Sequence, residues 1–423
     1  MFSYKKSPIL STLALTLVFS LGFSFMVNAQ HFTETRHTEL GFDASRLERL
    51  SHTLQEYVDQ DRISGGVTLV MRHGQPVFFE AFGMRDREAG DAMQRDAIFR
   101  IASQTKAIVA TAVMLLQEEG KLLISDPVGK YLPEYMETHV MTDTGIVPAS
   151  RPITIRDLLT HSAGIGYGWG PAAQYWREAG FQTWYLADRD EPIREIVRRM
   201  ASLPFDAHPG ERFVYGYAND ILGAMIEVIS NQPLDVFLHE RIFIPLQMHD
   251  THFFLPKEKA HRLAVVYSAT DNGLERAPDP GMGIGQGHYT DGPRKCFSGG
   301  AGLVSTANDY GRFLQMMLNG GELEGQRLLS PRTVQLMIVN HLTEIDFRPG
   351  LGIGLGFDVV TDLGAFARPG AVGDFGWGGA YHSTYWVSPQ DGLVVVFLSQ
   401  LTPAGGSDIH GKLRSLIYQA IMD

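Results

Sequence analysis

The sequence contains a single cysteine, Cys296, so no disulfide can form within the chain. It also lacks an excess of basic residues, because 36 lysines and arginines stand against 47 aspartates and glutamates, giving a formal net charge of -11. Phosphate binding requires clustered lysine and arginine, and no basic stripe is visible, so we expect no nucleic-acid partner. A chain of 423 residues is long enough for one large domain or two.

Signatures of several other enzyme classes are missing. The G-x-S-x-G motif of the usual α/β-hydrolases does not occur. The glycine-rich residues 281–287 do not have G-x-G-x-x-G spacing, which predicts a flexible loop and not a nucleotide site. His249 and His252 lie close together without a third ligand in view. We therefore expect neither a metal nor another cofactor.

The first residues have the pattern of a signal peptide. Lys5 and Lys6 precede an apolar run over residues 9–27, and Val27-Asn28-Ala29 resembles a small-residue cleavage site. The alternative is an uncleaved membrane anchor, although several serines and threonines dilute the run. No cysteine follows the run, which argues against a lipid anchor. The pattern predicts that residues 1–29 are removed on export to the periplasm or medium, with no stable membrane association afterwards.

The rest of the chain predicts an α+β fold in which strands lie early and late in the sequence. Apolar spacing predicts helices over residues 43–60, 155–160, 192–201, 220–230, 307–318, 330–339 and 407–421. Strands are expected in a hairpin over residues 65–84 and over residues 352–360, 371–376, 380–387 and 393–400. We expect one antiparallel sheet flanked by helices, formed by residues 30–133 and 296–423, with a mainly helical domain over residues 134–295.

Residues 99–106 (FRIASQTK) run into an apolar stretch and predict a turn followed by a buried helix. Ser103 would begin the helix, and Lys106 would lie one turn further on the same face. A serine hydroxyl is a poor nucleophile until a neighbour takes its proton, and Lys106 can be that neighbour or serve the group that is. The spacing alone is weak, because Ser3 and Lys6 repeat it; the structural alternative is an N-cap serine beside a solvated lysine.

Two further stretches contain candidate site residues. Tyr215 and Tyr217 precede an expected helix, and a tyrosine near cations can act as a general base, whereas the alternative is packing on that helix. Residues 375–380 (FGWGGA) are rich in glycine, which lets a strand approach a substrate closely. A backbone N–H there could stabilise an oxyanion; the alternative is a tight bend between strands.

Together these stretches resemble the serine β-lactamase and penicillin-binding-protein-like hydrolases, over nearly all of the chain after residue 29. The chain is most similar to class C β-lactamases and to the related family VIII carboxylesterases. The matching segments, in the order of that family, are residues 99–106, 153–164 (ITIRDLLTHSAG), 215–223, 298–303 (SGGAGL) and 376–379 (GWGG).

The resemblance implies a β-lactamase/DD-peptidase-like fold and a set of roles for residues in this chain. It implies that Ser103 is the nucleophile, that Lys106 takes part in proton transfer and that a tyrosine is the general base. We place the base at Tyr215, because its register to Asp220 and Gly223 matches the esterase branch, while Tyr217 remains the alternative. The oxyanion hole would be formed by the N–H groups of Ser103 and Ala380.

One departure from the family bears on the substrate. The lactamase branch has Lys-Thr-Gly on the strand beside the site, where this chain has Trp377, Gly378 and Gly379. Loss of a cation and a hydroxyl removes groups that would hold a β-lactam carboxylate, whereas an indole suits an uncharged, apolar substrate. We therefore expect a serine hydrolase acting on small, short-chain carboxylic esters. The alternatives are a β-lactamase or D-amino-acid peptidase with the same site, and a non-catalytic binder.

Aromatic residues are concentrated in one part of the expected helical domain. We expect Tyr167, Trp169 and Tyr217 to contact the substrate together with the strand residues Trp377, Gly378 and Gly379. The same stretch also contains Tyr175, Trp176, Phe181, Trp184 and Tyr185, and two interpretations remain open for it. The aromatic residues line an acyl pocket over Ser103, or they form the core of the helical domain itself.

Overall fold

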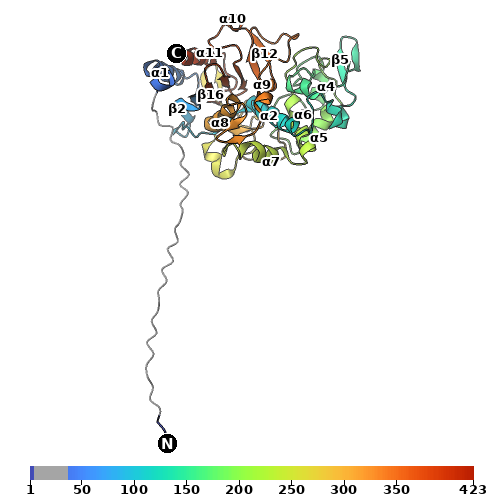
Figure 1. The fold of residues 1–423 in the computed structure, drawn as a ribbon. Helices are drawn as coiled ribbons and strands as arrows, with labels where there is room; N and C mark the ends of the chain where they lie inside the picture. Colours follow the sequence, from blue (N-terminus) through green and yellow to red (C-terminus); the bar gives the residue numbers. More distant parts are fainter. Residues whose placement is uncertain (4–36) are drawn as a thin grey trace. The chain divides into compact units, whose positions relative to one another are not determined.

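The computed structural model describes residues 1–3 and 37–423 of the chain, so the predicted signal peptide lies outside the described residues. An antiparallel sheet of eight strands forms its framework, in the order β12-β13-β14-β15-β16-β1-β2-β3 (Figure 1). Its strands are β1 (Gly65–Arg72), β2 (Gln75–Asp86), β3 (Asp91–Ala92), β12 (Leu351–Ile353), β13 (Asp358–Val360), β14 (Phe375–Gly379), β15 (Ser383–Ser388) and β16 (Leu393–Ser399). Early and late strands meet at β1 and β16, where Val67 pairs with Leu398. This arrangement confirms the predicted α+β class and its single antiparallel sheet.

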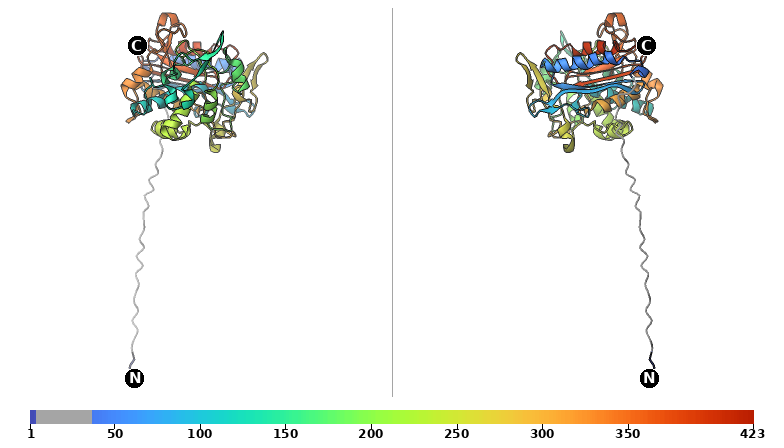
Figure 2. Two further views of the ribbon diagram at one scale, coloured as in Figure 1. Left: turned by 90° about the vertical axis from the view of Figure 1, so that its right-hand side faces the viewer. Right: turned by 90° about the vertical axis from the view of Figure 1, so that its left-hand side faces the viewer.

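Helices cover both faces of the sheet. One face packs against α1 (Ala44–Asp59) and α11 (Ile409–Tyr418), whose apolar residues join Val70, Val395 and Phe397 in one buried cluster. In Figure 2 these two helices lie across the strands in the right-hand view. The other face carries α2 (Thr105–Glu118) and α8 (Ala307–Leu318) in a larger cluster with Leu69 and Val396. Because successive side chains along a strand point to opposite faces of the sheet, each strand contributes residues to both clusters, as expected for a sheet buried on both sides.

The segment between the early and late strands is mainly helical. Its helices are α3 (Ile155–Leu159), α4 (Ala173–Glu178), α5 (Ile193–Met200), α6 (Ala218–Ser230) and α7 (Leu234–Leu238), which continues into the π-helix η5 (His239–Phe243). Two small hairpins, β5 (His139–Thr142) with β6 (Gly145–Pro148) and β7 (Tyr267–Thr270) with β8 (Gly273–Arg276), interrupt it. Residues Glu34–Asp423 form one compact unit, and the division into a sheet domain and a helical domain within that unit remains a prediction.

The remaining elements are short. The later part of the chain adds α9 (Pro331–Met337), α10 (Leu363–Phe366) and a hairpin of β10 (Glu322–Leu323) with β11 (Gln326–Arg327). β4 (Phe99–Arg100) pairs with β9 (Val304–Ser305). Single turns of 3-10 helix are η1 (Thr38–Leu40), η2 (Ala102–Gln104), η3 (Val128–Lys130), η4 (Pro133–Tyr135), η6 (Lys257–Arg262) and η7 (Met282–Ile284).

The structure differs from the expected strands at two places. Residues 352–360 were predicted as one strand, but they form the antiparallel pair β12 and β13, joined through Gly354 and Gly356. Gly356 has φ of +90°, a conformation that favours glycine, and a Cβ there would lie 2.6 Å from the Cβ of Ala110. The next strand, β14, begins at Phe375, four residues later than the predicted start at residue 371. These shifts place Trp377 and Gly379 within β14 and not beyond its end.

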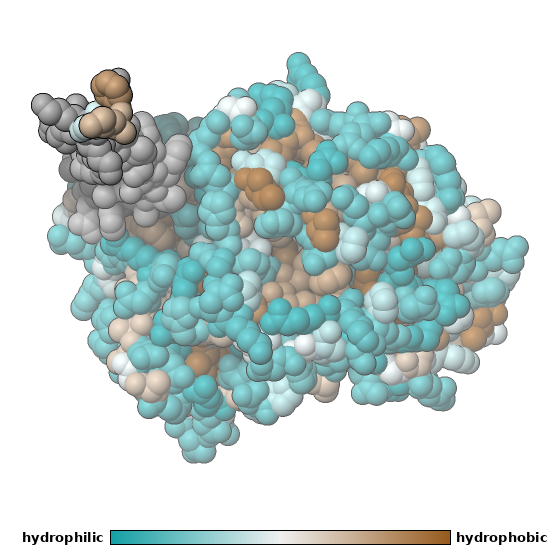
Figure 3. Space-filling view, turned by 90° about the horizontal axis from the view of Figure 1, so that it is seen from below, coloured by the Kyte–Doolittle hydropathy of each residue, from teal (hydrophilic) through white to brown (hydrophobic). Residues whose placement is uncertain are grey.

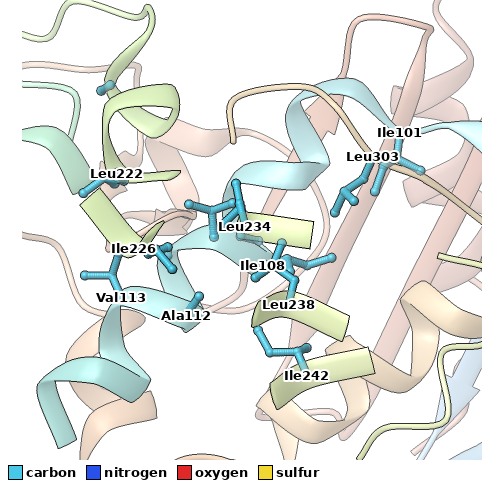
Figure 4. Close-up of a cluster of buried hydrophobic side chains, with 14 of the residues drawn as sticks. Ile101, Ile108, Ala112, Val113, Leu222, Ile226, Leu234, Leu238, Ile242 and Leu303 are labelled. Atoms are coloured by element: carbon cyan, nitrogen blue, oxygen red, sulfur yellow. The ribbon is translucent and has the colours of Figure 1, made fainter. Parts of the chain in front are cut away.

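Helix α2 is the buried centre of the molecule. Every residue from Thr105 to Leu116 is buried, as the apolar run predicted. Figure 4 shows Ile108, Ala112 and Val113 of α2 facing side chains of α6 and α7. A helix packed on several sides cannot shift without opening the core. The residues at its N-terminal end are therefore held in fixed positions.

The surface seen from below is mostly hydrophilic, with apolar residues in separate patches (Figure 3). Among the described residues, no single helix has the length and hydropathy needed to cross a membrane. One bent pair, Ala218–Ser230 with Leu234–Phe243, passes the same test together, with an angle of 82° between its halves.

Candidate active site

Ser103 lies in the tight turn η2, directly before α2. The preceding residue, Ala102, has φ of +42°, in the left-handed region that costs energy for a residue with a side chain. Ser103 is half-buried, and it lines a cleft of about 770 Å³. The strained turn thus directs a serine hydroxyl into a cleft, and the packed helix behind it fixes the position.

Lys106 is almost completely buried, with 3% of its surface exposed, and all three of its ammonium protons have an acceptor. Nζ lies 3.2 Å from Ser103 Oγ, 3.2 Å from the hydroxyl oxygen of Tyr167 and 2.7 Å from the carbonyl oxygen of Gly300. Nζ also lies 4.7 Å from the centre of the Tyr215 ring. The sequence predicted the contact between Ser103 and Lys106; the other acceptors come from distant parts of the chain.

Tyr215 is half-buried and lines the same cleft as Ser103. Its hydroxyl oxygen accepts a hydrogen bond from Trp377 Nε1 at 3.2 Å. An indole donor therefore lies on one side of the Tyr215 hydroxyl, and the side-chain nitrogen of Lys106 lies beside its ring. These contacts place Tyr215 on the cleft wall next to the Ser103–Lys106 pair.

Tyr167 and Tyr217 have different surroundings. Burial, followed by the influence of Tyr215, raises the pKa of Tyr167 well above its ordinary value, so Tyr167 stays protonated while its oxygen accepts from Lys106. Tyr217 is fully buried: its ring stacks on Trp176 at 5.6 Å and its hydroxyl donates to the carbonyl oxygen of Thr183. Tyr217 therefore lies outside the cleft wall, contrary to the expected substrate contact, because Trp176 and Phe181 enclose it.

Strand β14 forms the edge of the cleft beside Ser103. Trp377, Gly378, Gly379 and Ala380 all line the cavity. A Cβ on Gly379 would lie 2.6 Å from the carbonyl oxygen of Ile101, so only glycine lets the strand approach the nucleophile turn this closely. Ala380, the residue proposed for the oxyanion hole with Ser103, follows directly at the end of this strand.

Aromatic rings form the walls of the cleft near Ser103. Tyr215 contacts Trp377 at 5.6 Å between ring centres, and Trp377 stacks on Phe347 at 6.1 Å with an angle of 12°. Phe347 in turn contacts Phe213 at 4.7 Å. Trp169, which is 69% exposed, contributes a ring at the rim. The aromatic stretch of the helical segment is divided, because Tyr167, Trp169 and Trp184 line the cleft while Trp176, Phe181 and Tyr185 belong to the core.

The far part of the cleft is charged. Arg348 and Arg368 line it, and among the described residues neither forms an ion pair. Arg414 also lines this part, where it pairs with the buried carboxylate of Asp374. Burial raises the pKa of Asp358, on the cleft wall, to about 7. The cleft therefore has an aromatic part near Ser103 and a partly cationic part further away.

The other residues considered from the sequence have structural surroundings. Asp250, between the two histidines, pairs with Arg262 at 2.8 Å and Lys259 at 2.9 Å. No group of three metal-ligating side chains occurs within the part of the chain that the structure describes. Burial raises the pKa of Cys296 well above its ordinary value, which leaves the thiol unreactive. Burial and the charge of Lys106 hold the pKa of His161 well below its ordinary value, so His161 is neutral beside Tyr215.

The sequence interpretation did not single out two parts of the site. Phe213 and Phe347 complete the aromatic wall. Phe213 belongs to the Phe-x-Tyr register that relates Tyr215 to the esterase branch, but no place in the wall was predicted for it, and Phe347 is marked by no motif. Ser298 and Gly300 lie in the matched SGGAGL segment, and Asp220 lies in the matched segment after Tyr215, but no role was given to them. Glycine repeats beside a polar residue were the signal that could have identified a close backbone contact at Gly300.

The assembled groups can carry out acyl transfer. The Ser103 hydroxyl contacts the side-chain nitrogen of Lys106, the half-buried Tyr215 lies beside Lys106 in the same cleft, and the glycine-rich end of β14 lies close to the turn before Ser103. This is the set of positions required for a serine hydroxyl that loses its proton while attacking a carbonyl.

Comparison with known proteins agrees with this geometry. The chain is 33% identical to Esterase EstB of Burkholderia gladioli over 403 residues, which covers 90% of this chain and 97% of that protein. It is 27% identical to the Putative D-alanyl-D-alanine carboxypeptidase of Escherichia coli K12, over 87% of this chain and 85% of that one.

The solved structure of EstCE1, described as a hydrolase with promiscuous acyltransferase activity, superposes with a TM-score of 0.76. It is 29% identical and covers 88% of this chain and 98% of its own. The Beta-lactamase family profile matches residues 50–418. The chain therefore belongs to the Beta-lactamase family of serine hydrolases.

Proposed function

We propose that the protein is a serine carboxylesterase that hydrolyses short-chain esters through an acyl-enzyme on Ser103. The observation that carries this proposal is the position of Trp377, whose indole donates to Tyr215 at the cleft edge. An indole at that place offers an apolar face and a single neutral donor to the part of a substrate nearest Ser103. Uncharged ester groups suit such a wall better than a carboxylate does.

The reaction proceeds in two steps. Tyr215 takes the proton of Ser103, and Ser103 Oγ attacks the ester carbonyl while the N–H groups of Ser103 and Ala380 stabilise the oxyanion. The C–O bond to the alcohol breaks, the alcohol leaves with the proton from Tyr215, and an acyl-serine remains. Water then attacks the acyl-serine with Tyr215 as base, which releases the acid and regenerates Ser103.

A panel of p-nitrophenyl esters with rising acyl-chain length tests the proposal. We expect a burst of p-nitrophenol followed by steady turnover, fastest for short acyl chains, and loss of both phases in Ser103→Ala. A Ser103→Ala protein with full esterase activity would exclude the mechanism. A mass spectrum in which the peptide containing Ser103 gains the mass of the acyl group would identify the nucleophile directly.

The second candidate is a β-lactamase or D-amino-acid peptidase with the same site. Its specific support is the cationic far part of the cleft, where Arg348 and Arg368 are available to a substrate carboxylate. Nitrocefin and a D-alanyl-D-alanine peptide distinguish it from an esterase: turnover of either at a kcat/KM above that of the best ester would favour this candidate.

We also propose that the protein acts outside the cytoplasm, after removal of residues 1–29. The supporting pattern is the charged, apolar and small-residue succession at the N-terminus. N-terminal sequencing of the protein recovered from the periplasm or medium should begin at Gln30. Recovery only from the cytoplasm with Met1 intact would contradict export.

A further inference from the structure

A buried carboxylate lies behind the catalytic lysine and has no access to the cleft. Asp220, in the first turn of α6, is fully buried. Its Oδ1 accepts a hydrogen bond from Ser298 Oγ at 2.6 Å and another from the N–H of Gly300 at 3.1 Å. A fully buried carboxylate is costly unless something balances its charge, so its partners matter.

The hydrogen bonds of Asp220 continue to Lys106 through one peptide group. Ser298 Oγ, which donates to Asp220, accepts from the N–H of Ala301 at 3.3 Å. The carbonyl of that same peptide group belongs to Gly300, and it accepts from Lys106 Nζ at 2.7 Å. Carboxylate, hydroxyl, peptide and ammonium thus form a continuous chain, in which each hydrogen bond polarises the next.

The backbone around this chain is tightly packed. A Cβ on Gly300 would lie 2.5 Å from Asp220 Oδ2, and a Cβ on Gly299 would lie 2.3 Å from the carbonyl oxygen of Asn219. The side chain of Asn219 donates to the carbonyl oxygen of Lys106 at 3.3 Å. Adjacent residues of α6 therefore hold both ends of Lys106, one through its backbone and the other through the Gly300 carbonyl.

Lys106 is the cation that balances Asp220. The pKa of Asp220 is raised from its ordinary value, because burial outweighs the hydrogen bond from Ser298 and the charge of Lys106, which both lower it. Oδ2 has no hydrogen-bond partner among the described residues, so the charge of the carboxylate is balanced by Lys106 and by the N-terminal turn of α6, which favours negative charge. The other titratable groups that influence Asp220 or Lys106 are uncharged tyrosines, a thiol and a neutral histidine: Tyr135, Tyr167, Tyr217, Cys296 and His161. Tyr215, whose ring lies 4.7 Å from Lys106 Nζ, is the proposed base for Ser103.

We propose that Asp220 is a positioning residue that balances the charge of Lys106 and fixes it between Ser103 and Tyr215 through Ser298 and the Gly300 peptide. The proposal rests on the proposed function of Ser103 as nucleophile. It assigns proton abstraction to Tyr215, since a lysine held as ammonium has no lone pair with which to accept the proton. Lys106 then contributes charge and not basicity.

The experiment measures phosphonylation of Ser103 by a fluorophosphonate probe against pH, which does not depend on the natural substrate. In this reaction the P–F bond breaks, a P–O bond to Ser103 forms, and the serine proton passes to Tyr215. Asp220→Asn keeps the acceptor for Ser298 and Gly300 but removes the charge. We expect the alkaline limb of the rate profile to move down by about one pH unit, because the charge that balances Lys106 is gone. The rate on that limb falls by about tenfold.

A matched control exists in the same protein. Asp309, in the first turn of α8, is also buried and accepts from the N–H of Asp250 at 2.7 Å and from Thr251 Oγ1 at 3.1 Å, away from Lys106. Asp309→Asn should leave the alkaline limb in place. An equal shift in both variants, or an unshifted limb in Asp220→Asn, would overturn the proposal.

Ser298→Ala provides a second measurement, which carries the test if Asp220→Asn does not fold. It keeps the carboxylate but breaks the chain of hydrogen bonds, and we expect a shift of about half a pH unit in the same direction. No shift in folded Ser298→Ala would equally overturn the proposal. Failure of the wild-type protein to label at Ser103 would instead refute the nucleophile, and with it the proposed function.

Discussion

The assignment of the general base can be tested by removing one hydroxyl at a time. Tyr215→Phe and Tyr167→Phe are matched changes, because each deletes one oxygen from a ring beside Lys106 and leaves the ring itself. Tyr215 lies in the cleft with its oxygen bonded to Trp377, whereas Tyr167 is 4% exposed with its oxygen bonded to Lys106. If Tyr215 is the base, the two losses differ in size.

The expected magnitudes follow from the two roles. Loss of a general base costs about 100-fold to 10,000-fold in rate. Loss of Tyr167 removes one of three acceptors of a buried ammonium ion, and a hydrogen bond to a charged group is worth about 1.5–3 kcal/mol, or about 10-fold to 150-fold. From the centres of these two ranges, we expect Tyr215→Phe to be slower than Tyr167→Phe by about 25-fold in acylation, while KM changes little.

The assay is the burst phase with p-nitrophenyl acetate, which isolates acylation from release of the acid. Circular dichroism of each variant confirms that the fold is retained. Equal losses, or a larger loss in Tyr167→Phe, would show that the proton does not pass through Tyr215. Such a result would move the base to the Lys106–Tyr167 pair.

Three further predictions test other parts of the structure. Trp377→Phe keeps an aromatic ring stacked on Phe347 but deletes the hydrogen-bond donor to Tyr215, so kcat for ester hydrolysis should fall by about 10-fold to 100-fold. An unchanged kcat would show that the indole N–H takes no part in the mechanism. Gly379→Ala places a methyl group 2.6 Å from the carbonyl oxygen of Ile101, so β14 must move away from Ser103. We expect kcat/KM to fall by about 100-fold, whereas wild-type kinetics would show that β14 need not lie so close. Arg414→Met leaves the buried carboxylate of Asp374 without its cation, and urea denaturation should show that the free energy of unfolding falls by about 3–5 kcal/mol. A loss below about 1 kcal/mol would be inconsistent with a buried ion pair.

Local patterns were sufficient to predict the buried helix after Ser103 and the contact between Ser103 and Lys106. The apolar run predicted the helix, and a spacing of three residues allowed Lys106 Nζ to reach Ser103 Oγ, although the same spacing at Ser3 and Lys6 shows that it is not decisive by itself. The early and late strands were also predictable from their composition. The exception was residues 352–360, where two glycines form a turn between short strands that periodicity alone joined into one.

Long-range packing distinguishes residues that sequence spacing left equivalent. Tyr215 and Tyr217 are two residues apart on one loop, and sequence spacing could not show that Trp176 and Phe181 would enclose Tyr217. The wall formed by Phe213 and Phe347 joins segments more than a hundred residues apart. The chain of hydrogen bonds from Asp220 requires residues 298–301 to lie against the start of α6, which no local pattern predicts.

The buried carboxylate of Asp220 matters for the proposed mechanism because Trp377 stands where the class C β-lactamases have a lysine. A cation on strand β14, as the resemblance to class C β-lactamases implies, would favour negative charge on the base tyrosine from the cleft side. Here an indole N–H takes that place, and Lys106 is the one cation in contact with Ser103 or Tyr215 within the described residues. A neutral donor offsets less charge than an ammonium ion, so the proposed role of Tyr215 as base depends on the charge of Lys106. The carboxylate of Asp220 supplies the balancing negative charge from behind Lys106. Its burial costs folding free energy, but a carboxylate inside the cleft would repel the oxyanion.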